Sequence, residues 1–142
     1  MGGMENTRDI LLATRRIALV GASDKPHRSS HAVMGFLLAR GYDVMPVNPV
    51  LAGREIHGRR VVASLAEAGP LDMVDIFRRS EEAGAVMDEA MALGARTLWL
   101  QLGVVDEDAA ARARAKGLAV VMDRCPVIEW GAHALPPRVI PA

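Results

Sequence analysis

Five short apolar runs recur along the chain, and a polar turn follows each of them. The runs are nearly continuous rather than alternating, which is typical of strands buried on both faces of a parallel sheet. Segments with helical spacing separate most of them, and this β-α alternation predicts a parallel sheet with right-handed crossovers. The five runs are Ile17–Val20, Val44–Val47, Met73–Phe77, Thr97–Leu100 and Leu118–Met122.

Three of the intervening segments carry the end signals of helices. Gly41, Gly94 and Gly117 each follow a helical segment, at the position where a helix commonly ends in a left-handed residue. The third segment begins with the acids of residues 106–108 and ends with the bases of residues 112–116. This order complements the helix dipole and supports the assignment.

Pro46 lies inside the second apolar run and cannot donate a hydrogen bond to a neighbouring strand. Either the strand ends early, or Pro46 faces an unpaired side of it.

These patterns predict an α/β fold, a Rossmann-like three-layer α/β/α sandwich with a parallel sheet of about five strands. The length of 142 residues suits a single domain, and 51% of the residues are apolar. Within residues 1–142 we expect an N-terminal extension over 1–14, a core over 15–130 and a tail over 131–142. The extension contains a short helix at Met4–Thr14.

The turn after the first run is the most informative segment for function. The run ends in Gly21, passes through a polar and basic loop with Ser23, Lys25 and Arg28, and enters a helix near Ser30. A glycine lets the backbone approach a phosphate, and a helix N-terminus offers free N–H groups. The second and third glycines of the dinucleotide fingerprint are absent, so we expect a phosphorylated ligand other than ordinary NAD.

Polar residues also follow the other runs. Because ligands of open parallel sheets bind beyond the carboxyl ends of the strands, these residues converge on one edge. A NAD site carries an acid after its second strand, but this chain has Val47-Asn48-Pro49 and no carboxylate before Glu55. This argues against NAD and leaves a phosphorylated adenosine open. The further polar residues at this edge are Arg78, Arg79, Gln101, Gly103, Asp123 and Arg124.

Composition excludes several classes of function. Lys and Arg number 17, and Asp and Glu also number 17, so no overall field favours nucleic acid or an anionic membrane. The single cysteine, Cys125, excludes an internal disulfide and fits a reducing compartment. The four histidines have no metal-ligand spacing, so no metal is expected. The sequence shows no secretory or membrane segment, and we expect a cytoplasmic protein.

Five motifs in order resemble a known family over residues 15–130. The chain resembles the small CoA-binding proteins of bacteria and archaea, and is similar to the N-terminal CoA-binding domain of the succinyl-CoA synthetase α subunit. The motifs are Val20–Ser23, Gly41–Val44 leading to Pro46–Pro49, Val74–Arg78, Trp99–Gly103 and Val121–Pro126.

The resemblance implies a role for each turn in holding coenzyme A. The first turn would hold the phosphates, and the second would border the adenosine. The third would line the other side of the ligand site, where the planar guanidinium of Arg78 would bind a phosphate. The residues so implied are Gly21, Ala22, Ser23, Lys25, Ser30, Val47, Asn48, Pro49, Ile76, Phe77, Arg78 and Gln101.

We therefore expect a protein that binds CoA or a short acyl-CoA without catalysis by this chain alone. The synthetase adds a domain with a phosphorylated histidine and a nucleotide-grasp subunit, and neither is in this sequence. One alternative is an NAD(P)-binding regulatory domain, with Arg54, Arg59 and Arg60 near the second turn. Another is the CoA-binding subunit of a split acyl-CoA ligase. A homodimer is left open.

Two residues near this edge have competing interpretations. Cys125 follows the fifth run, where it is either a reactive thiol facing CoA or a small buried hydrophobe. The buried interpretation is favoured, since that is the usual environment of a free cysteine. His27 lies in the phosphate loop and is interpreted as a solvated loop residue.

Overall fold

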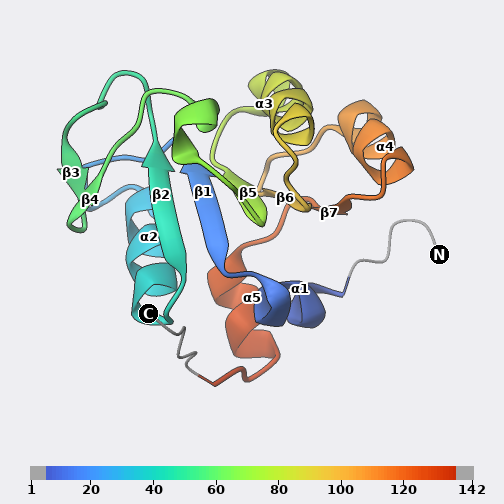
Figure 1. Cartoon of the computed structure of the whole chain (residues 1–142). Coiled ribbons are helices and arrows are strands. Elements are labelled where there is room, and N and C mark those ends of the chain that lie inside the picture. Colours follow the sequence, from blue (N-terminus) through green and yellow to red (C-terminus); the bar gives the residue numbers. More distant parts are fainter. Residues whose placement is uncertain (1–5, 137–142) are drawn as a thin grey trace.

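The fold is built around a sheet of five parallel strands, in the order β2-β1-β5-β6-β7 (Figure 1). A computed structural model describes residues 6–136, so Met4, Glu5 and residues 137–142 of the predicted end segments lie outside it. The expected α/β class and the five strands are confirmed. The strands are β1 (Arg16–Val20), β2 (Asp43–Val47), β5 (Met73–Ile76), β6 (Thr97–Leu100) and β7 (Ala119–Val121).

Helices cover both faces of this sheet (Figure 1). One face carries α1 (Thr7–Ala13), α2 (Ser29–Ala39) and α5 (Pro126–Ala132). The other carries α3 (Ser80–Ala92), α4 (Glu107–Ala115) and the short 3-10 helix η1 (Leu65–Ala68). Alternate strand residues enter two separate cores: Ile17 and Leu19 pack toward α2, and Ala18 and Val20 toward α3. Strands buried on both faces explain the continuous apolar runs.

The connection from β2 to β5 is not a regular crossover helix. It contains the two-stranded hairpin of β3 (Glu55–Ile56) and β4 (Arg59–Arg60), followed by η1. These strands are only two residues long, so they leave no periodic pattern in the sequence.

Pro46 lies within β2, which forms an edge of the sheet and continues to Val47. The Pro46 carbonyl accepts a hydrogen bond from the N–H of Val62 at 3.0 Å. Since the nitrogen and carbonyl of a strand residue face the same side, the Pro46 nitrogen points away from β1. The strand therefore does not end early, and β1 needs no donor from Pro46.

The helix ends agree with the sequence signals. Gly41, Gly94 and Gly117 follow α2, α3 and α4 with φ angles of 97°, 85° and 88°. The side chain of Asp106 caps α4 by accepting a hydrogen bond from the N–H of Ala109 at 2.9 Å. These helix ends are therefore marked by residues next to them in the sequence.

The N-terminal helix is attached to the last one. The hydroxyl of Thr7 on α1 donates to Oε1 of Glu129 on α5 at 2.7 Å, and the Tyr42 hydroxyl donates to the carbonyl of Leu11. The predicted boundary between core and tail at residue 130 falls within α5, and Leu135 beyond that helix is also buried.

Asp75 is a charged residue type in the middle of the central strand β5. It is fully buried, and neither carboxyl oxygen has a hydrogen-bond partner among the described residues. Burial raises the pKa of the Asp75 carboxyl well above its ordinary value of 3.8, because a charge there would lose its hydration. The folded protein therefore carries Asp75 as a neutral acid at a pH where the unfolded chain has released the proton.

We expect Asp75→Asn to flatten the pH dependence of stability. In the wild-type protein the contribution of Asp75 to the free energy of unfolding should fall as pH rises above 3.8, because the folded state retains a proton that the unfolded chain releases. The amide of the variant does not titrate, so this decline should be missing. Urea unfolding at a series of pH values measures both slopes, and equal slopes would mean that Asp75 is ionised in the folded protein.

Candidate functional site

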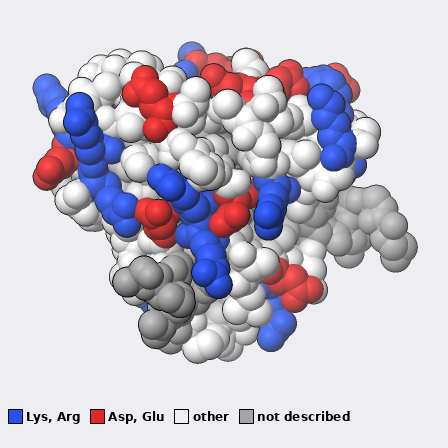
Figure 2. All heavy atoms as spheres, viewed as in Figure 1, with Lys and Arg blue, Asp and Glu red and all other residues white. Residues whose placement is uncertain are grey.

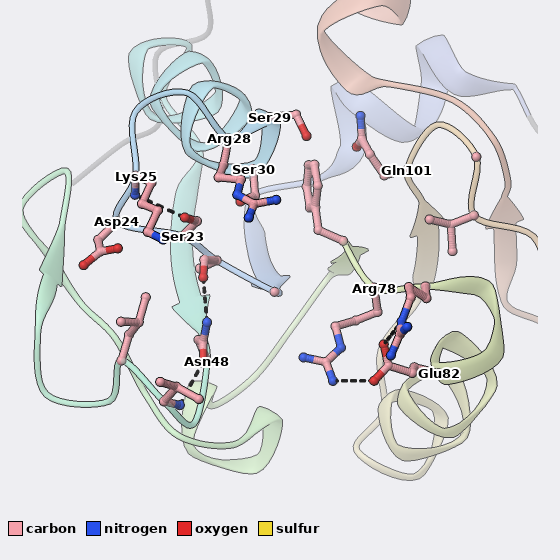
Figure 3. Close-up of a pocket in the computed structure, with 18 of the residues that line it drawn as sticks. Ser23, Asp24, Lys25, Arg28, Ser29, Ser30, Asn48, Arg78, Glu82 and Gln101 are labelled. Atoms are coloured by element: carbon pink, nitrogen blue, oxygen red, sulfur yellow. Dashed lines mark hydrogen bonds and ion pairs between the residues drawn. The ribbon is translucent and has the colours of Figure 1, made fainter.

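A pocket of about 770 Å³ lies at the carboxyl edge of the sheet (Figure 3). The strand order explains its place. The chain leaves β1 toward β2 and later returns to β5 on the other side of β1, so the two connections diverge and a crevice opens between them. The loops after β1, β2, β5 and β6 all contribute residues to the wall.

Gly21 allows the loop after β1 to cross the end of β5. Its φ is 90°, and a Cβ atom at this position would lie 2.2 Å from the carbonyl oxygen of Phe77. The N–H of Phe77 in turn donates to the carbonyl of Val20 at 2.8 Å. Any other residue would face both a disfavoured backbone conformation and a collision with backbone.

Asn48 holds the loop after β1 against the loop after β2. Its Nδ2 donates to the carbonyl of Ala22 at 2.8 Å, and its Oδ1 accepts from the N–H of Val50 at 2.9 Å. The Val47 carbonyl accepts from the N–H of Gly21 at 3.1 Å. Asn48 therefore lines the pocket but is engaged within the protein, while Val47 is buried and acts through its backbone.

The α2 side of the pocket is rich in hydrogen-bond donors and positive charge. Arg28 precedes α2 and does not cap the helix with its side chain. The N–H of His31 donates to the Arg28 carbonyl at 3.1 Å, and the first two residues of the helix, Ser29 and Ser30, line the pocket. The side chains of Lys25 and Arg28 are exposed and form no ion pair within residues 6–136. Figure 3 shows both residues beside the serines at the start of α2. This arrangement favours an anionic group.

The opposite side carries two arginines that are held by one acid. Arg78 Nη2 lies 3.0 Å from Glu82, and Arg79 Nε lies 3.4 Å from it. The hydrogen bond from Arg79 and the charge of Arg78 hold the pKa of Glu82 below its ordinary value. Nε of Arg78 is buried and has no partner among the described residues. Arg78 is thus oriented at the pocket with a donor to spare.

Gln101 follows β6 and forms part of the same wall. The residue is only 6% exposed, and its Oε1 is buried without a hydrogen-bond partner among the described residues. In Figure 3 Gln101 lies on the side of the pocket opposite Asn48 and Lys25.

The structure brings most of the predicted site residues together. Gly21, Ala22, Ser23, Lys25, Ser30, Asn48, Phe77, Arg78 and Gln101 all line the pocket. The remaining predicted residues, Val47, Pro49 and Ile76, do not line it. Val47 and Ile76 are buried strand residues, and Pro49 lies exposed in the loop after β2.

Several pocket residues were missing from the predicted set. Glu82 was missed although its position four residues after Arg78 is the spacing of a helical ion pair. The sequence placed Arg28, Arg79 and Gly103 at this edge of the sheet, although the predicted set of ligand contacts did not include them. The others are Asp24, Ser29, Val50, Leu51, Leu102 and Val104, and loops bring most of them to the wall without a periodic signal.

Cys125 and His27 do not belong to this wall. Cys125 is 8% exposed and packs in the core with Trp130, as the buried interpretation expects. His27 is exposed in the loop before α2. In the described part of the chain, no group of three or more His, Cys, Asp or Glu side chains is placed to hold a metal ion.

The surface charge is mixed. On the face shown in Figure 2, basic and acidic side chains are interleaved rather than gathered into one basic patch. None of the helices within residues 6–136 combines the length and the apolar character needed to cross a membrane. The positive groups of the pocket therefore act locally on a small anion rather than as part of an extended basic surface.

Comparison with known proteins confirms the resemblance found in the sequence. The family described as CoA binding domain matches residues 15–131 of this chain. A Bacillus subtilis (strain 168) relative, called uncharacterized protein YneT, is 41% identical over 129 residues, which cover 90% of this chain and 92% of the relative.

Solved structures share the fold at nearly full length. A hypothetical protein from Pyrococcus horikoshii OT3 is 34% identical, with a TM-score of 0.85 and coverage of 92% of each chain. Cell-free ID.343 from Thermus thermophilus is also 34% identical, with a TM-score of 0.84, covering 90% of this chain and 98% of its own. The whole described sheet and its helices thus correspond to an arrangement seen in related chains.

We expect Gly21→Ala to destabilise the protein by about 2–5 kcal/mol, because it combines a strained φ with overpacking against the Phe77 carbonyl. Gly53→Ala is the matched control, since Gly53 also has a φ of 90° but nothing lies within 4 Å of its added Cβ. That variant should be destabilised only by its strained backbone angle, by about 1–2 kcal/mol.

Urea unfolding of the two variants without added ligand measures the difference. Equal losses would show that the Phe77 carbonyl moves aside at little cost, and that Gly21 is needed only for its backbone angle.

Proposed function

Because this chain belongs to the CoA binding domain family, we propose that it binds coenzyme A or a short acyl-CoA in the pocket at the carboxyl edge of the sheet. The observation that carries the proposal is that Lys25 and Arg28, which form no ion pair among the described residues, lie beside the start of α2 in the loop that follows Gly21. A diphosphate is the part of CoA that matches this chemistry.

The diphosphate would lie over residues 21–25, where the backbone comes close to the ligand. Lys25 and Arg28 supply charge from the α2 side, and Arg78 supplies a planar fork from the α3 side. The acid on the α2 side, Asp24, lies 3.5 Å from Arg54. Neither Lys25 nor Arg28 forms an ion pair among the described residues, so a phosphate need not displace an ion pair of these two cations.

The adenosine would lie on the β2 side of this point. Val50 is 85% exposed, and together with Leu51 it offers apolar surface at the pocket wall. Both polar ends of the Asn48 side chain are already engaged, so Asn48 is not a substitute for the acid that holds the ribose of NAD. This favours CoA over an NAD-binding regulatory role.

We propose that the chain acts by binding rather than by catalysis of its own. Two acids line the pocket, and each has an arginine partner. Glu82 is held by Arg78 and Arg79, which lower its pKa and make it a weak base, and Asp24 lies 3.5 Å from Arg54. The buried thiol of Cys125 suits a reducing compartment, and we place the binding in the cytoplasm.

Calorimetric titration of the purified protein with CoA, acetyl-CoA, NAD and NADP tests the ligand. Mass spectrometry first checks for ligand carried over from expression. We expect saturable binding of CoA with little heat from NAD. Binding heat with a nicotinamide nucleotide, together with no binding heat with CoA, would overturn the proposal.

We expect Arg78→Ala to weaken CoA binding by about 1.5–3 kcal/mol, the range for a hydrogen bond to a charged group, or about tenfold to a hundredfold in Kd. Arg112→Ala removes the same charge from α4, where Arg112 pairs with Asp88 at 3.1 Å outside the pocket wall. The control should bind CoA as the wild-type protein does. An unchanged Kd in Arg78→Ala would remove Arg78 from the site.

A further inference from the structure

Gln101 is a buried polar side chain of the pocket wall with no hydrogen-bond partner among the described residues. It is 6% exposed, and its Oε1 makes no hydrogen bond to any residue in the range 6–136. A buried polar group without a partner costs stability, so such a group in a native protein needs an explanation. Its position in the wall indicates a ligand group as the partner.

The surroundings of Gln101 differ from the rest of the pocket. The loop after β6, residues 101–104, contributes Gln101, Leu102, Gly103 and Val104 to the wall and contains no charged residue. Leu102 is 54% exposed and offers apolar surface at the wall beside Gln101. The charged groups lie instead in the loops before α2 and α3 and, for Glu82, on α3 itself. The β6 side therefore fits a neutral ligand segment that is partly apolar and carries isolated hydrogen-bonding groups.

We propose that Gln101 recognises an amide group of the pantetheine arm of CoA, and that Leu102 covers the apolar atoms of that arm. This inference rests on the proposed function. A carboxamide has two donors and one acceptor, and rotation about its last bond exchanges their places. It can therefore pair with either the carbonyl or the N–H of a ligand amide. An ionised phosphate only accepts hydrogen bonds and would leave the Gln101 acceptor unpaired.

The sheet geometry places this contact at a suitable distance from the phosphates. β6 is separated from β1 by β5 alone, so the two strand ends lie about 10 Å apart at the usual spacing of neighbouring strands. With the diphosphate over the end of β1 and the adenosine toward β2, the other arm of CoA runs across β5 to β6. The amides of pantetheine lie along that arm.

The test compares two ligands on wild-type protein and on the variant Gln101→Met. The ligands are CoA and 3′-phosphoadenosine 5′-diphosphate, which lacks the pantetheine arm. We expect the variant to bind CoA about threefold to tenfold more weakly, the effect of one neutral hydrogen bond, and to bind the truncated ligand unchanged. The unliganded variant should melt at the same or a higher temperature, because the methionine leaves no buried amide unpaired.

Two further variants separate the arms of the ligand. Leu102→Ala should also weaken the binding of CoA and leave the binding of the truncated ligand unchanged. Arg28→Ala should weaken the binding of both ligands by the same factor, because the proposed contact of Arg28 is with the phosphates that both ligands carry.

The possible outcomes are distinguishable. If wild-type protein binds CoA but Gln101→Met binds it equally well, or loses affinity for both ligands alike, the assignment of Gln101 is overturned and CoA binding stands. If wild-type protein binds neither ligand, the proposed function fails and the inference fails with it.

Discussion

The close approach of Gly21 to the Phe77 carbonyl is the constraint on which the site depends. At that point the loop after β1 passes directly over the end of β5, with a separation that leaves no room for a side chain. The crossing brings the start of α2 and the start of α3 to opposite sides of one crevice. A larger residue would push the loop outward and carry with it Ser23, Lys25 and the helix N–H groups. The backbone contact therefore sets the geometry of every charged group in the pocket.

The pocket changes its chemical character along its length. Lys25 and Arg28 are unpaired on the α2 side, Arg78 and Arg79 are held by Glu82 on the α3 side, and the β6 loop is neutral. A compact phosphate ligand would use only the first of these regions. A long ligand with an aromatic end, a charged middle and an amide-bearing arm uses all of them, which is the chemical order of coenzyme A. On the face shown in Figure 2, basic and acidic side chains are interleaved, so no single basic patch extends over that face.

Two buried polar groups show how this fold accepts a loss of stability near its site. Asp75 in the central strand and Gln101 after β6 both lack partners within the described protein, although an apolar residue would pack at either place without that loss. For Gln101 the proposed hydrogen bond to a ligand amide would offset the loss, because the residue lines the pocket. For Asp75 it is offset by the dense apolar packing on both faces of the sheet, and the residue survives there as a neutral acid.

The apolar runs, the helix-ending glycines and the turn at Gly21 predicted the α/β fold and the edge of the binding pocket. Those signals are local: burial on both faces, helix ends and a tight turn each depend on a few neighbouring residues. The hairpin of β3 and β4, the loop-holding role of Asn48 and the pairing of Glu82 with Arg79 could not be predicted in this way. They depend on contacts between loops that leave no period in the chain. The sequence by itself determined which strands form and where a phosphate group would approach. Only the tertiary structure decided which polar groups are engaged with each other and which remain available to a ligand, because those pairings are set by distances across separate loops.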